Sequence, residues 1–184
     1  MARATGFRAL AIWLAIFGLG IALLFPLHIT QIQTEVGKDV IEARPYDVKV
    51  TNYSDTTVIK TEILQYNMMP KPSTFASTFF DNLGIIWCAL IIISLLALII
   101  EYFRAEDLGR YNQFALLSLV TSIFAVLIFY FVYSSYLLAQ FKYGFVETTS
   151  DHATGVATGF YGALVSIFLS FLVAMQGYTS KEVR

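Results

Sequence analysis

Cysteine is nearly absent from this sequence, and its absence excludes several classes of function. The 184 residues include one cysteine, Cys88, and two histidines, His28 and His152. An intrachain disulfide is therefore impossible, and zinc fingers, iron–sulfur clusters and redox-active cysteine pairs are excluded with it. Two histidines far apart in the sequence do not predict a metal site. The residues indicate no cofactor.

Charge is scarce as well. Only 14% of the residues are charged, 57% are hydrophobic, and the net charge is -1. A soluble domain is usually about 25% charged, so this composition is typical of membrane proteins. A chain without an excess of positive charge has no basic surface to attract nucleic acid. We therefore expect no nucleic-acid partner.

Four apolar runs are long enough to cross a membrane, which takes about 20 mostly apolar residues. The fold class predicted is an all-α four-helix transmembrane bundle with a small extracytoplasmic β-hairpin or sheet. The apolar core of the first run is too long for a signal peptide and no small-residue cleavage site follows, so we expect an uncleaved helix. The predicted segments are 1–29 (cytoplasmic N-terminus and first span), 30–80 (extracytoplasmic β-rich loop), 81–103 (second span), 104–113 (cytoplasmic turn), 114–138 (third span), 139–155 (short extracytoplasmic loop), 156–177 (fourth span) and 178–184 (cytoplasmic C-terminus).

Lysine and arginine in the short loops predict the orientation of these spans. Six basic residues lie on the side that holds both termini, against one in the short loop on the other side. We therefore expect a multi-pass protein of the cell membrane with both termini in the cytoplasm. The six are Arg3, Arg8, Arg104, Arg110, Lys181 and Arg184, and the one is Lys142.

Acidic residues lie in the turn between the second and third runs, and we interpret this turn as solvated. Glu101 and Arg104 are three residues apart and are expected to pair on one helix face. Glu106 and Asp107 follow, with no histidine, cysteine or serine nucleophile beside them. No run carries a charge at its centre, where proton relays and ion paths are usually marked by one. We assign no catalytic residue and expect no enzyme.

The fourth run carries small residues at helical spacing. Gly155 and Gly159 form a GxxxG motif, and Gly162 and Ser166 continue the stripe. Such a stripe lets two helix backbones approach closely. Packing within the bundle and contact with another subunit both remain open.

Residues 30–80 alone have the alternating, β-branched character of strands. We expect a hairpin of Tyr46–Thr51 with Thr56–Gln65, a turn at Asn52–Asp55, and a third strand at Thr30–Val36. Asn52 also begins the glycosylation sequon Asn-Tyr-Ser, so a modified asparagine and an Asx-type turn are both open. The outer interaction surface is expected to include Tyr46, Lys49, Tyr53, Lys60 and Glu62.

The order of these segments resembles the layout of claudin-type tetraspan proteins: a strand-rich loop of about 50 residues after the first span, then a short second loop, with both termini inside. The resemblance covers the topology of the whole chain and no diagnostic motif. Claudin-type proteins carry a W…GLW…C…C signature in the first loop, and residues 30–80 contain neither tryptophan nor cysteine. The same order also resembles permease-like subunits that work with an ABC ATPase.

These observations predict a non-catalytic integral membrane protein that serves as an accessory or scaffolding subunit of a larger membrane complex. Its expected partners are membrane lipids and other membrane protein subunits, with a homo-oligomer also open. Two other hypotheses remain. One is a claudin-like adhesion protein that self-associates through its outer β-domain, and the other is the membrane subunit of an ATPase-coupled transporter.

Overall fold

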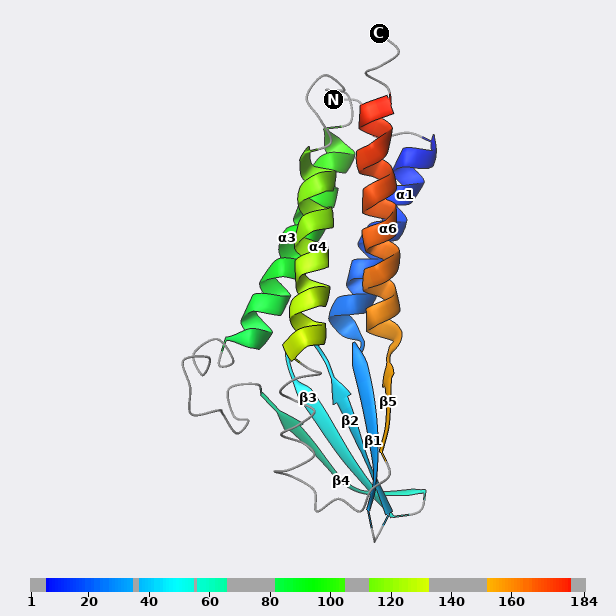
Figure 1. Ribbon diagram of the computed structural model, residues 1–184, viewed down its shortest axis with the longest axis vertical. Coiled ribbons are helices and arrows are strands. Elements are labelled where there is room, and N and C mark those ends of the chain that lie inside the picture. Colours follow the sequence, from blue (N-terminus) through cyan, green and yellow to red (C-terminus); the bar gives the residue numbers. More distant parts are fainter. Residues whose placement is uncertain are drawn as a thin grey trace.

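The computed structural model describes residues 6–34, 37–54, 56–65, 82–104, 113–132 and 152–179. Within them, four helices pack side by side and a β-sheet extends from one end of the helices (Figure 1). The helices are α1 (Gly6–Leu24), α3 (Leu83–Phe103), α4 (Gln113–Val132) and α6 (Thr158–Thr179). The strands are β1 (His28–Thr34), β2 (Gly37–Ala43), β3 (Val48–Ser54), β4 (Thr57–Leu64) and β5 (His152–Val156).

All four helices are long and apolar enough to cross a membrane, judged by length and composition. Their mean hydropathy lies between 1.9 and 3.0, and only about a third of each apolar window is buried inside the molecule. The helices form a closed bundle, in which α1 packs against α6 and α3, and α4 packs against α3 and α6. Large apolar side chains therefore cover the outside of the bundle, among them Phe17, Ile85, Phe124 and Phe168.

The closest helix contact joins α1 to α6 through glycine. A Cβ atom on Gly18 would lie 2.6 Å from the carbonyl oxygen of Gly162, and a Cβ atom on Gly162 would lie 2.6 Å from that of Gly18. Nearer the sheet, Gly159 meets the backbone in the same way, because a Cβ atom there would lie 2.6 Å from the oxygen of Phe25. Only glycine allows backbones to approach this closely.

Each of these helices is connected directly to a strand: α1 is followed by β1, and α6 is preceded by β5. Helix α1 ends at Leu24, five residues before the predicted end of the first span, and β1 begins at His28. Pro26 accounts for the early end, because proline disfavours the helical conformation in the residue before it and lacks an N–H group. The backbone at this turn is still satisfied, since Gly159 N–H donates to the oxygen of Pro26 at 2.9 Å and Ala157 N–H donates to that of Leu27 at 3.0 Å.

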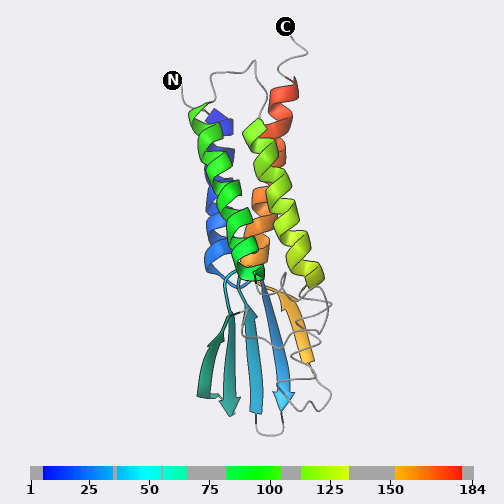
Figure 2. The same cartoon turned by 90° about the vertical axis from the view of Figure 1, so that its left-hand side faces the viewer.

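The sheet has five antiparallel strands in the order β4-β3-β2-β1-β5 (Figure 2). The predicted hairpin and third strand correspond to β3, β4 and β1. Strand β2 was not predicted, because its sequence GKDVIEA is rich in residues that strands usually avoid. Strand β5 was not predicted either: it lies in the segment expected to be a short loop and pairs with β1 from His28↔Val156 to Ile32↔His152.

One apolar core joins the sheet to the helices. Trp87 of α3 stacks on Phe129 of α4, with ring centroids 4.7 Å apart, and both side chains are buried. Ile41 and Val48, on neighbouring strands, are fully buried in the same cluster. The sheet therefore rests on the ends of the helices, with a shared hydrophobic core between them.

The bounds of the other predicted segments differ slightly from the structure, and some of these segments lie partly outside the described residues. The fourth helix covers Thr158–Thr179, two residues later than predicted at each end. The third begins at Gln113, and its described part ends at Val132. Most of the predicted turn 104–113 and the end of the C-terminal segment 178–184 lie outside the described residues.

The contact between Gly18 and Gly162 predicts the effect of adding one methyl group. Gly162→Ala would force α1 and α6 apart, because the new Cβ atom meets backbone and the branched side chain of Ile21. Overpacking typically costs about 1–3 kcal/mol, so we expect a clearly lower thermal midpoint in detergent. Gly20→Ala is the matched control, since nothing lies within 4 Å of a Cβ atom at Gly20. An unchanged midpoint for Gly162→Ala would contradict this account of the α1–α6 contact.

Candidate interaction surface

The register of the sheet distributes the predicted surface residues over two faces. Residues paired across neighbouring strands share a face, and successive residues along a strand alternate between faces. Lys49 and Tyr53 of β3 lie on one face, which we call the open face because Gln31 and Gln33 are exposed there. Asn52, Lys60 and Glu62 lie on the opposite face, which we call the core face because it also carries the buried Ile41 and Val48. Tyr46 lies in the turn between β2 and β3 and is exposed.

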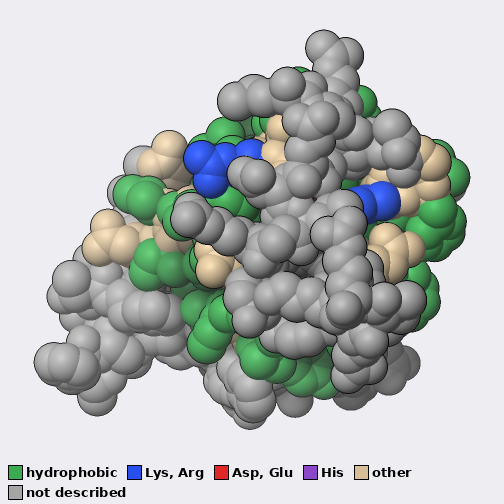
Figure 3. All heavy atoms as spheres, turned by 90° about the horizontal axis from the view of Figure 1, so that it is seen from above, with side chains coloured by type: hydrophobic (Ala, Val, Ile, Leu, Met, Phe, Trp, Pro, Cys, Tyr) green, Lys and Arg blue, Asp and Glu red, His purple; other side chains and the backbone are tan. Residues whose placement is uncertain are grey.

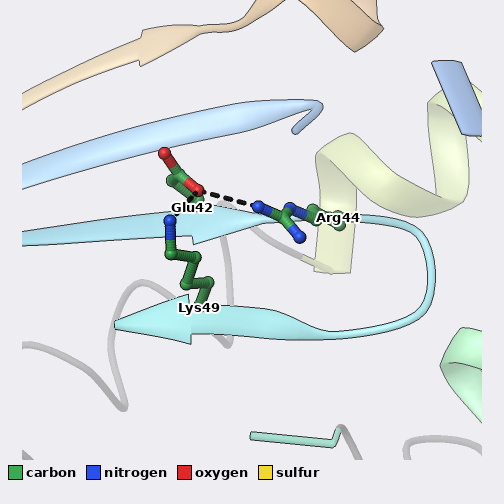
Figure 4. A network of polar contacts seen from close by, with 3 residues as sticks. All are labelled: Glu42, Arg44 and Lys49. Carbon is green, nitrogen blue, oxygen red and sulfur yellow. Dashed lines mark hydrogen bonds and ion pairs between the residues drawn. The ribbon is translucent and has the colours of Figure 1, made fainter. Parts of the chain in front are cut away.

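The open face carries a small charge network at the end nearest the helices. Glu42 of β2 accepts a hydrogen bond from the Arg44 guanidinium at 3.1 Å and forms an ion pair with Lys49 of β3 at 3.5 Å (Figure 4). Farther along this face, the Lys38 ammonium lies 5.4 Å from the ring centroid of Tyr53. Exposed pairs of this kind contribute little stability, about 0–1 kcal/mol each. Lys49 and Tyr53 are thus already engaged by neighbours within the sheet.

Asn52 lies inside strand β3, and not at the turn that the sequence predicted. The strand continues to Ser54, so three of the four residues expected in the turn Asn52–Asp55 belong to β3, and Asp55 lies outside the described residues. The Asn52 amide donates a hydrogen bond of 2.7 Å to the Asp39 carboxylate on β2. Its side chain is therefore occupied in a cross-strand pair and only partly exposed. This environment favours a structural role over the role of a glycosylation acceptor, which needs an accessible asparagine in a loop.

Strand β4 is the most exposed element of the sheet. It lies at one end of the strand order, so among the described strands it has a neighbour on one side only. Val58, Ile59 and Ile63 are 51%, 63% and 62% exposed. On the core face, Lys60 and Glu62 form an ion pair along the strand, and both side chains reach solvent. An exposed edge strand with apolar side chains is a template for pairing with another chain.

The turn beside Tyr46 holds a buried acid. Asp47 is 8% exposed, and its Oδ1 atom has no hydrogen-bond partner among the described residues. Burial raises the pKa of the Asp47 carboxyl above its ordinary value of 3.8, and Glu42 raises it further, while Arg44 and Lys49 oppose the rise. Ionisation of Asp47 is therefore less favourable in the folded protein than in the unfolded chain.

Only part of the predicted small-residue stripe lies on a helix. Gly159, Gly162 and Ser166 lie on α6 and are buried, and the Ser166 Cβ atom lies 3.4 Å from a Cβ atom placed on Gly18. Gly155 is different: it belongs to strand β5, pairs with Ile29, and has nothing within 4 Å of a Cβ atom. The GxxxG spacing of Gly155 and Gly159 thus spans a strand and a helix. The glycine pair that holds two helices together is Gly18 with Gly162.

Glu101 pairs across the bundle, which corrects the predicted Glu101–Arg104 pair. Glu101 of α3 is 4% exposed and accepts a hydrogen bond from the guanidinium of Arg8 on α1. Arg104 lies instead over the ring of Phe114, 5.5 Å from its centroid. Basic side chains emerge among apolar ones at this end of the bundle, away from the sheet (Figure 3). Glu106 and Asp107 lie outside the described residues.

Apolar side chains of the described helices enclose one small cavity. A cavity of about 20 Å³ lies between the four helices, lined mainly by apolar side chains such as Leu19, Trp87 and Phe160. That volume holds about one water molecule, far less than the several hundred Å³ of a typical small-molecule site. Among the described residues, no group of three histidine, cysteine or acidic side chains is placed to hold a metal ion.

No protein-family model matches the chain, and a comparison with curated protein sequences finds no match.

Asp47 predicts a pH dependence of stability with a definite sign. Because its pKa in the folded state is raised, ionising Asp47 opposes folding, and stability falls as the pH rises from about 4 through that pKa. Asp47→Asn should remove this loss and raise the unfolding midpoint near pH 7, with a smaller change near pH 3. Unfolding midpoints of both proteins between pH 3 and 8 provide the test. A variant that is less stable than the wild type at pH 7 would contradict it.

The Arg8–Glu101 pair predicts a large effect of removing one charge. Glu101→Gln leaves the guanidinium of Arg8 without its carboxylate in a nearly buried place. Breaking a buried ion pair in this way costs about 3 kcal/mol, so the thermal midpoint in detergent should fall strongly. Arg104→Gln is the control, because Arg104 is exposed at the same end of α3. Equal effects of the two changes would argue against the cross-bundle pair.

Proposed function

We propose that this chain is an integral membrane protein with four membrane-spanning helices and a non-catalytic role as an accessory or scaffolding subunit of a membrane complex. In this proposal both termini lie in the cytoplasm, and the sheet lies on the other side of the membrane. The observation that carries the role is the attachment of the sheet. It is held to the helices by two direct helix–strand connections and a shared core, while its edge strand β4 stays exposed.

Exposed side chains support the placement in a membrane. Phenylalanine, leucine and isoleucine cover the outside of the helices. Exposing these side chains to water would be unfavourable, whereas contact with lipid tails is favourable. The sheet, in contrast, exposes lysine, glutamine, threonine and glutamate. The excess of basic residues near both termini and in segment 104–113 supports a cytoplasmic position for that end.

The order of helices and strands also supports a claudin-like layout as part of this proposal. A claudin-like protein would use the outer sheet for contacts between like chains, which makes adhesion the second candidate function. The observation that favours it is the exposed β4 edge, since edge strands pair readily with other chains. The third candidate, a transporter subunit, predicts an ATP-hydrolysing partner bound at Glu101–Arg110.

Partner composition tests the proposal. Tagged chain is extracted from its native membranes in a mild detergent, and co-migrating proteins are quantified by mass spectrometry, with membranes carrying the untagged chain as control. Unlike membrane proteins at a constant ratio are the expected result. The chain alone, or only with copies of itself, would overturn the subunit role in favour of adhesion. A constant-ratio partner that hydrolyses ATP would replace it with the transporter.

A further inference from the structure

The sequence of strand β4 is complementary to itself when two copies run antiparallel. The strand reads TVIKTEIL, with Thr61 at the centre of the segment Val58–Leu64. Reading outward from Thr61, lysine on one side is matched by glutamate on the other, and isoleucine is matched by isoleucine. Opposite charges and like apolar residues therefore stand at equal distances from the central residue.

We propose that β4 pairs antiparallel with β4 of a second copy of this chain, with Thr61 of the two copies opposite each other. The sheet then continues across the contact and doubles its number of strands. The proposal goes beyond the scaffolding role, because it names a second copy as one partner and β4 as the contact.

In this register each charged side chain meets its opposite. Lys60 faces Glu62 of the second copy, and Glu62 faces its Lys60, so two new ion pairs join the Lys60–Glu62 pair within each strand. The four charges lie on the same face of the extended sheet and alternate in sign. Directly opposite charges on neighbouring strands stabilise the pairing. A parallel arrangement in register would instead set lysine beside lysine and glutamate beside glutamate.

The apolar side chains of the edge also find partners. Ile63 meets Ile59 of the second copy, and these two side chains are 62% and 63% exposed in the single chain. From Lys60 to Leu64, β4 pairs regularly with β3, which keeps this half of the edge straight. The register shifts between Asn52 and Tyr53, opposite Ile59, at the far end of the strand. The charged residues Lys60 and Glu62 lie in the regularly paired part of the strand.

Cross-linking tests the register directly. Thr61→Cys is introduced together with Cys88→Ala, which removes the native cysteine, and the purified full chain is treated in mild detergent with a short thiol-to-thiol cross-linker. We expect a covalent dimer from Thr61→Cys. Gln31→Cys in the same background is the control, because Gln31 is exposed on β1, away from the β4 edge. No dimer from Thr61→Cys, or equal dimer from both variants, would overturn the proposal.

Charge exchange gives a second test. Lys60→Glu alone and Glu62→Lys alone should each weaken self-association about tenfold or more, because both cross-strand pairs become repulsive at once. Mixing these two variants should restore association, and so should the double exchange Lys60→Glu/Glu62→Lys in one chain. Restoration also shows that the variants are folded. Loss of association without restoration would overturn the antiparallel register.

The outcomes separate this inference from the proposed function. If other membrane proteins co-migrate at a constant ratio but Thr61→Cys gives no dimer, the scaffolding role is supported and the β4 pairing is overturned. A Thr61→Cys dimer without unlike partners would support the β4 pairing and remove the subunit role.

Discussion

The rest of the structure depends on the close approach of α1 and α6 at Gly18 and Gly162. Each of these glycines presents its carbonyl oxygen where the other would carry a Cβ atom, so any side chain would push the helices apart. The contact fixes more than two helices, because α1 continues into β1 and α6 is preceded directly by β5, and these two strands pair. Two helix–strand segments are thereby joined both through their helices and through their strands, and the other elements are added to their sides.

This arrangement explains how so small a sheet keeps its register. A hairpin of β3 and β4 alone would be marginal in water. Here β1 is held at its start by hydrogen bonds to Ala43 and Ala157 through Leu27, and the core face of β2 and β3 packs on Trp87 and Phe129. A slip by one residue would turn Ile41 and Val48 away from that core. The register of the inner strands is therefore set by the helices, whereas β4 at the far edge pairs, among the described strands, with β3 alone.

The parts predicted from the sequence are those with strong local signals. Long apolar runs predicted the helices, and β-branched residues predicted β1, β3 and β4. Strand β2 could not be predicted, since Gly37, Lys38 and Glu42 disfavour strands and only pairing on both sides holds it. The sequence did not predict the partners of Gly162 and Glu101 either, because Gly18 and Arg8 are far away in sequence. Local spacing instead favoured the nearer residues Gly155 and Arg104.

Polar groups inside the bundle serve packing between helices. Ser94 of α3 lies 2.6 Å from the hydroxyl of Thr121 on α4 and donates to the carbonyl of Leu90, and Ser122 donates to Ser94. Hydroxyl contacts between helices are also common in the bundles of membrane proteins. The one buried ion pair, among the described residues, lies at the end away from the sheet and joins α1 to α3. On the sheet, the edge strand β4 combines exposed apolar side chains with the charged pair Lys60 and Glu62.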